Sequence, residues 1–221
     1  MYHFFVKGAD IKKIIQKTEI PTLDIIPETH DLVVLDKFLG TEVGREEIFK
    51  DKLLPHLQEY DVIIFDNGPS WNHLIENAIF ASDTIICPLG CNLLAYNASK
   101  TNFDTIKEFQ RKKKLFNQII IAYATLVERS GISQQIYSEY ISGHKDSLLP
   151  DTPIKSSVKW QEALMAGISI LEYVPEGEMV ENYYNLITHM WTRATRGEVI
   201  NVRNSRKRNT KTSPQVETQN G

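Results

Sequence analysis

The sequence predicts an α/β fold, with a mostly parallel β-sheet and helices on both of its faces. Short apolar runs rich in β-branched residues are closed by turn residues, which is typical of buried parallel strands. Longer stretches with helical features separate these runs, and this alternation is the pattern of βαβ units. The 221 residues, of which 42% are hydrophobic, are enough to build the core of one domain.

The clearest strand candidate is the run VIIF at residues 62–65, because Asp66 and a Gly-Pro turn follow it directly. A second run, TIIC, begins at Thr84 and is closed by Pro88 and Gly90. The expected strands are residues 23–26, 61–66, 83–88, 118–124, a short one near 152–155, and 168–173.

Helices are expected between these strands. Ser70 is the expected N-cap of the helix that follows the Gly-Pro turn. Pro55 is expected to interrupt or restart one helix, and Gly167 to end another in a left-handed conformation. The expected helices are residues 44–59, 71–81, 94–114, 132–142, 157–166 and 178–196.

Asp66 stands at the carboxyl end of the expected strand 61–66, where open α/β sheets bind their ligands. In nucleoside triphosphatases a carboxylate in this place holds Mg²⁺, usually through water. An Asp that closes a strand in a tight turn is the structural alternative. Four apolar residues followed by Asp do not decide between the two.

The order of motifs around Asp66 resembles the ParA family of partition ATPases. The chain reads YDVIIFDNGPS and then NAIFASDTIICPLG. The family has YDxIIIDxPPS, a helix ending in NAL-xx-AD, and a strand xxIxP. The resemblance covers about residues 9–192 through weaker pieces such as SQQIY at 133–137. It departs at Asn67 and Gly68, where the family more often has a residue followed by Pro.

The resemblance implies a P-loop NTPase-like fold that binds ATP and Mg²⁺. It implies that Asp66 is the catalytic carboxylate on the magnesium side, acting on the metal through water. The other residues that it places around the nucleotide are Gly68, Pro69 and Ser70 beside the γ-phosphate, and Thr125, Pro153, Ile154 and Lys155 at the adenine end.

The family's phosphate-binding loop does not occur in this sequence. No glycine is followed by lysine, so neither GxxxxGK[ST] nor KGGxGKT is present. We expect residues 1–196 to form a ParA-like nucleotide-binding domain that begins inside the family's domain, incomplete at the N-terminus. A stand-alone paralogue without the loop is the alternative. The family hydrolyses ATP, but this chain alone is expected to be inactive.

Residues 197–221 are expected to be a disordered, basic and polar tail. Such a segment either binds DNA phosphates without sequence preference or only keeps the protein in solution. The resemblance favours DNA, since ParA dimers bind non-specific DNA through basic residues of the C-terminal half. The candidates are Arg193, Arg196, Arg203, Lys207 and Arg208.

The resemblance implies a role in plasmid or chromosome partition. The protein would be a cytoplasmic, nucleoid-associated homodimer with a centromere-binding, ParB-like partner. The alternative is a non-catalytic interaction or regulatory protein of ParA type. No membrane role is expected, because the apolar runs are too short to cross a bilayer and the stripe after Trp191 is too thin for an anchor.

Cys87 and Cys91 are the two cysteines of the chain. Two cysteines without histidine support are a poor zinc site, which needs four ligands. We expect Cys87 to be a small core residue of its strand.

Overall fold

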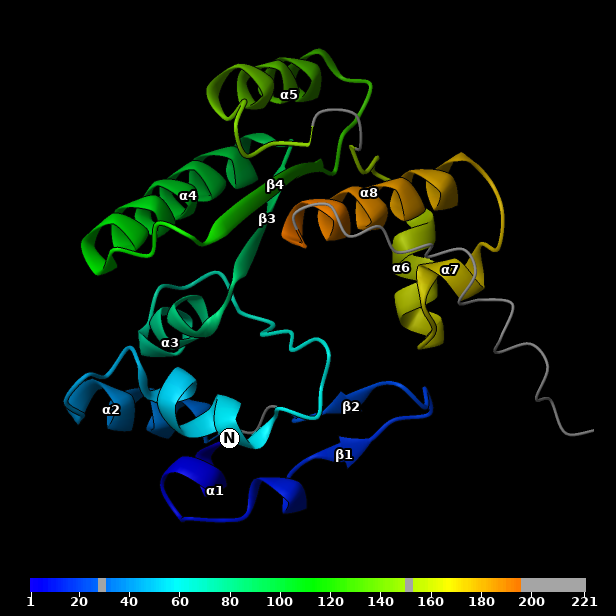
Figure 1. Ribbon diagram of the computed structural model, residues 1–221. Coiled ribbons are helices and arrows are strands. Elements are labelled where there is room, and N and C mark those ends of the chain that lie inside the picture. Colours follow the sequence, from blue (N-terminus) through cyan, green and yellow to red (C-terminus); the bar gives the residue numbers. More distant parts are fainter. Residues whose placement is uncertain (28–30, 150–152, 196–221) are drawn as a thin grey trace, which may run out of the picture. The chain divides into compact units, whose positions relative to one another are not determined.

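The computed structural model describes residues 1–27, 31–149 and 153–195 (Figure 1). The chain forms two compact units, Met1–Ser82 and a second one from Asp83 onward. Across the described ranges no helix is both long and apolar enough to cross a membrane.

The first unit is built from short helices and one small hairpin. The two-residue strands of the hairpin pair antiparallel, with Gln16 opposite Ile25. Leu35 and Leu39, one turn apart on one helix, are fully buried with Phe49 and Leu53. The elements are α1 (Tyr2–Phe5), η1 (Ile11–Lys13), β1 (Gln16–Lys17), β2 (Asp24–Ile25), α2 (Leu32–Thr41), η2 (Phe49–Leu53), η3 (Leu54–His56) and α3 (His73–Ala81).

The start of α3 is held by two side chains that satisfy its free N–H groups. The Asn72 side chain accepts from the Ile75 N–H at 2.9 Å. From α2, Asp36 accepts from the N–H groups of His73 and Leu74 at 2.8 and 3.3 Å. The predicted helix is confirmed, but its cap is Asn72 and not Ser70.

The predicted strand 61–66 is wrong for this structure. The segment is assigned to no strand, and Ile64 is 81% exposed. The described strands of the first unit, β1 and β2, form a sheet of two strands that does not include residues 61–66. Among these described strands, the run 61–66 therefore pairs with none, and an unpaired apolar run does not form a strand. The strand expected at 23–26 is present as β2, in an antiparallel hairpin and not in a parallel sheet. The helix expected at 44–59 is replaced by η2 and η3, with Pro55 inside η3.

The second unit has the predicted α/β character. Its two long strands are parallel over seven residue pairs, from Thr84 opposite Ile119 to Gly90 opposite Thr125. Helices lie on both sides of this strand pair in Figure 1. The elements are β3 (Thr84–Gly90), α4 (Leu93–Lys113), β4 (Ile119–Thr125), α5 (Gly131–Gly143), α6 (Val158–Ala166), α7 (Ile170–Tyr173) and α8 (Glu178–Ala194).

The core of the second unit follows the alternation of side chains along the strands. Ala122 and Ala124 of β4 belong to a buried cluster with Phe103 of α4 and Tyr140 of α5. α8 also packs against β4. The strands 83–88 and 118–124 and the helices expected at 94–114, 132–142, 157–166 and 178–196 are confirmed within a few residues over the described range.

The predicted strand 168–173 is wrong, because this segment contains the helix α7. Ser169 accepts from the Glu172 N–H at 3.3 Å, and the Glu172 carboxylate accepts from the Ser169 N–H at 3.0 Å. This reciprocal capping box starts a helix. Gly167 ends α6 with φ of 68°, as predicted. Of the short strand expected near 152–155, the described residues 153–155 form a parallel bridge to β4's continuation, between Lys155 and Val127, and no longer strand.

Candidate nucleotide-binding site

Residues 154–156 run beside the carboxyl end of β4. The Ile154 N–H donates to the Ala124 carbonyl at 2.8 Å, and the Val127 N–H donates to the Ile154 carbonyl at 3.1 Å. The Ser156 N–H continues the pairing to the Val127 carbonyl at 3.0 Å. The predicted residues Ile154 and Lys155 therefore lie beside the end of β4, whose last residue is the predicted Thr125, where parallel strands present their ligands.

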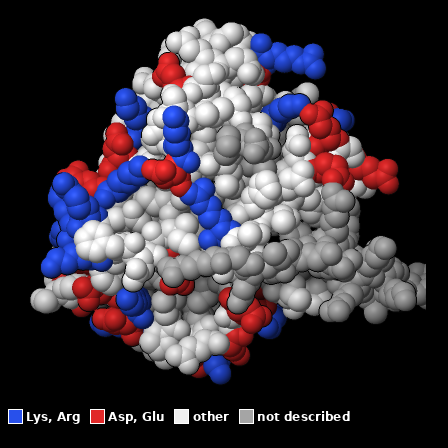
Figure 2. Space-filling view, turned by 45° about the horizontal axis from the view of Figure 1, so that its top comes forward, with Lys and Arg blue, Asp and Glu red and all other residues white. Residues whose placement is uncertain are grey.

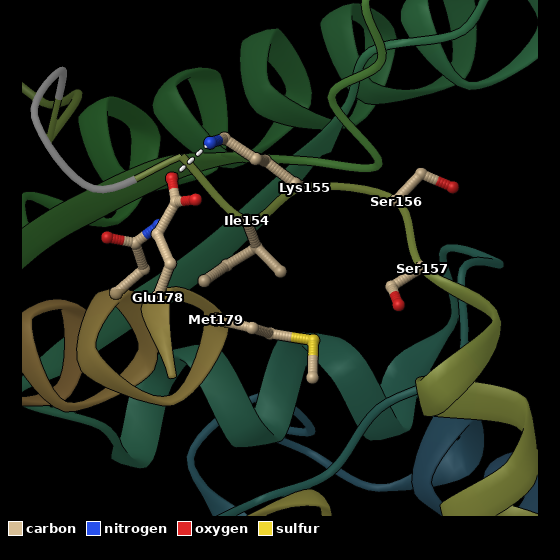
Figure 3. Close-up of a pocket in the computed structure, with 7 residues that line it drawn as sticks. Ile154, Lys155, Ser156, Ser157, Glu178 and Met179 are labelled. Atoms are coloured by element: carbon tan, nitrogen blue, oxygen red, sulfur yellow. Dashed lines mark hydrogen bonds and ion pairs between the residues drawn. The ribbon is translucent and has the colours of Figure 1, made fainter. Parts of the chain in front are cut away.

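A cavity of about 230 Å³ opens at this place (Figure 3). One wall is residues 154–157, which stand directly before α6, and the other is the start of α8. In Figure 3 the apolar side chains of Ile154 and Met179 lie on opposite sides of the space. The lining residues are Ile154, Lys155, Ser156, Ser157, Glu178, Met179 and Asn182.

An ion pair between Lys155 and Glu178 joins the two walls. The hydrogen bond from Lys155, and then its charge, lower the pKa of the Glu178 carboxyl below its usual value. The two side chains are 58% and 73% exposed, and such pairs contribute little to stability. The pair can therefore open at small cost when a ligand enters.

The lining combines two apolar side chains, Ile154 and Met179, with five polar or charged residues. Ser157 is already used, since its hydroxyl caps α6. Sequence reasoning missed Ser156, Ser157, Glu178, Met179 and Asn182. The start of α8 could be predicted, but no local signal tells that this end of the helix faces residues 154–157.

The turn predicted to lie at the γ-phosphate belongs to the first unit. Asp66, Gly68 and Ser70 are exposed in the coil before α3. The Asn67 side chain donates to the Phe65 carbonyl at 2.9 Å. Within the described residues no three His, Cys, Asp or Glu side chains gather as a metal site. Asp66 could therefore hold Mg²⁺ only together with water and phosphate oxygens.

Arg193, the one predicted DNA-binding residue that is described, is used inside the fold. Its guanidinium donates to the carbonyls of Ser147, at 3.2 Å, and of Asp146. These bonds fix the end of α8 to residues 146–147 and leave other donors of the guanidinium for a ligand. The remaining candidates, Arg196, Arg203, Lys207 and Arg208, lie outside the described residues, as does the expected tail.

Both cysteines are free and buried, which confirms the prediction for Cys87. Burial raises the pKa of Cys87 and of Cys91 to about 11. Both thiols are therefore protonated at neutral pH, a poor state for metal binding or nucleophilic chemistry.

A family model described as an AAA domain matches residues 1–121, which are 121 of the 221 residues. The sporulation initiation inhibitor protein Soj of Bacillus subtilis is 29% identical over 187 residues, which are 84% of this chain and 74% of that protein. The chromosome partitioning protein ParA of Myxococcus xanthus is 25% identical over 198 residues, which are 88% of this chain and 69% of that protein.

The structure of a Cyanothece McdA–ATP complex superposes with a TM-score of 0.73 at 16% identity, over 90% of this chain and 75% of that one. The second unit, with its parallel strand pair between helices, has the α/β character of the P-loop NTPase-like fold. The chain belongs to the ParA family of P-loop ATPases, within the AAA domain family.

Proposed function

We propose that this protein is a ParA-like partition protein that binds the adenine end of ATP in the pocket at the carboxyl end of β4. The observation that supports the proposal is that Ile154 and Lys155 line that pocket beside the end of β4, in a chain of the ParA family. The protein would act as a homodimer on non-specific DNA, at the nucleoid, with a ParB-like partner.

The residues present fit the base of the nucleotide. Ile154 and Met179 offer apolar surface for the two faces of a ring, and Asn182 offers an amide that both donates and accepts hydrogen bonds. The backbone of residues 154–156 fixes one wall through its pairing with β4.

The residues present do not fit the triphosphate. The sequence has no glycine followed by lysine, so the loop whose N–H groups and lysine surround the phosphates does not occur. Asp66, with the turn Gly68, Pro69 and Ser70, is proposed to face Mg²⁺ in an intact family member. Residues 1–221 by themselves should therefore release no phosphate from ATP.

Nucleotide binding tests the base pocket directly. In Met179→Trp the indole ring should fill the cavity. ADP or adenosine should then bind at least about tenfold more weakly than to the parent, a loss of about 1.4 kcal/mol. The matched control is Met165→Trp, because Met165 is 90% exposed on α6 and outside the pocket. Titration calorimetry on the full chain gives both affinities. Equal affinity for the two variants would place the base elsewhere.

A non-catalytic regulatory protein is the second candidate, and the missing loop sequence favours it. Such a protein would associate with an intact ParA without needing nucleotide. Turnover of ATP by residues 1–221 that disappears in Asp66→Ala would exclude this candidate and give Asp66 its catalytic role.

A further inference from the structure

One face of α4 carries a row of basic side chains. Lys100, Lys107 and Arg111 are exposed and stand seven and then four residues apart, which places them on one side of the helix. At 1.5 Å per residue the row is about 16 Å long. We call these three residues the α4 row.

A second segment brings another lysine to the same place. The ring of His144 packs on the ring of Phe103 of α4, with centroids 4.4 Å apart. Lys107 and Lys100 both act electrostatically on His144, so both lie near it. Lys145, exposed, follows directly in the chain. The segment after α5 therefore extends the α4 row sideways.

The end of α8 meets this segment as well, since Arg193 donates to the carbonyls of Asp146 and Ser147. The sequence that continues after α8 is basic. On the face shown in Figure 2 basic side chains gather at the left edge, the side on which α4 ends in Figure 1.

The acidic groups nearby do not cancel the row. Asp104 lies between Lys100 and Lys107 on the helix. Glu108 forms an ion pair with Lys112, with 2.7 Å between Oε1 and Nζ. With Lys145 included, four basic side chains stand against Asp104 and Asp146. The surface keeps a net positive charge.

We propose, in addition to the DNA binding already included in the proposed function, that the α4 row with Lys145 is a docking surface for the phosphate backbone of duplex DNA. About 16 Å of duplex presents roughly nine phosphate charges, a continuous target for a straight row of this length. Single strands are bound by stacking on exposed aromatic rings. The ring on this surface, Phe103, is buried and has the Lys107 ammonium above it at 4.6 Å.

The test is the salt dependence of binding by the full chain, with and without ATP and Mg²⁺. The probe is a fluorescent duplex of arbitrary sequence, of about 30 base pairs, read by anisotropy. The row variant is Lys100→Gln/Lys107→Gln/Arg111→Gln. The matched control is Lys12→Gln/Lys13→Gln/Lys37→Gln, which removes the same charge from exposed residues of the first unit.

Three lost phosphate contacts, at about 0.9 each, should reduce the salt slope by about 2.7, and the control should keep the slope of the parent. Between about 50 and 200 mM salt the parent should then lose about 40-fold more affinity than the row variant. If the row variant keeps the salt slope of the parent, or if the control loses as much slope as the row variant, the α4 row is not the DNA-binding surface, although the protein still binds DNA. A parent that binds no duplex at the lowest salt overturns the DNA part of the proposed function together with the surface.

A second measurement does not depend on the variants folding. The duplex should protect Lys100 and Lys107 of the parent from amine acetylation, and Lys12 and Lys13 should react as before. Equal reactivity of Lys100 and Lys107 with and without duplex overturns the surface. If duplex RNA or poly-glutamate displaces the fluorescent duplex more strongly than unlabelled duplex DNA does, duplex DNA is not the preferred partner of this surface.

Discussion

Asn77 is the most consequential polar side chain of the first unit, and replacing it by alanine should unfold that unit at lower denaturant. The residue is fully buried in α3. Its Oδ1 accepts from the Phe49 N–H at 3.0 Å. Its Nδ2 donates to the carbonyls of Arg45 and His73 at 2.6 and 2.8 Å. The Asn77 side chain thus connects α3 to η2, at Phe49, and to the segment before η2, at Arg45.

The magnitude follows from the groups left behind in Asn77→Ala. The Phe49 N–H and the Arg45 carbonyl each lose a partner that the structure shows, and a buried unsatisfied group costs about 1–3 kcal/mol. The variant should therefore lose about 2–6 kcal/mol of the free energy of unfolding of the first unit. Against a total of about 5–15 kcal/mol for a typical protein, this is a large share.

Urea unfolding should follow the first unit by itself, because two units need not unfold together. Trp71 is the single tryptophan of this unit, so Trp160→Phe/Trp191→Phe gives a background in which fluorescence reports on it. The control is Asn97→Ala, at an exposed position of α4. A loss below about 1 kcal/mol would be ordinary for a surface change and would refute the reasoning.

Three further predictions concern the second unit. Burial, and then the charge of Lys107, lower the pKa of His144, so the folded protein takes up a proton there at a lower pH than the unfolded chain. As the pH falls below about 6.5, the unfolded chain is protonated first, and the free energy of unfolding decreases. The unfolding midpoint should therefore drop less on acidification in His144→Gln than in the parent. In Gly90→Ala the new Cβ would stand 2.5 Å from the Ala95 Cβ, and thermal unfolding should show a loss of about 1–3 kcal/mol, whereas an unchanged midpoint would contradict the packing. Cys87 and Cys91 should react with a disulfide reagent only after urea unfolding, and fast reaction of the native chain would contradict their burial.

The sequence predicted the second unit well because its signals are local and its partners are close along the chain. β3 and β4 are joined by one helix, so a strand pattern at 83–88 has its neighbour at 118–124. The caps are equally local, as Gly167 shows. The P-loop NTPase-like fold and the ParA family, both indicated by ordered motifs, are confirmed.

The two failed strand predictions have different physical causes. An apolar run such as 61–66 becomes a strand only if another strand pairs with it, and composition does not report that partner. At 168–173 the apolar content indicated a strand, and the reciprocal bonds of Ser169 and Glu172 decided for a helix. The functional assignments of Asp66, of its turn and of the DNA-binding arginines stay predictions.

The clamp that Arg193 makes on the carbonyls of Asp146 and Ser147 has a mechanical consequence. A pull on the chain beyond α8 would load α8, which the guanidinium holds to residues 146–147 and which also packs against β4. The adjacent Leu148 N–H donates to the His144 carbonyl, and the Ser147 carbonyl accepts from the Ala122 N–H of β4 at 2.8 Å. One path of this tension therefore runs from α8 through Arg193 and the Ser147 carbonyl to the buried strand, and in Arg193→Lys, with a single ammonium, this path would yield at lower force.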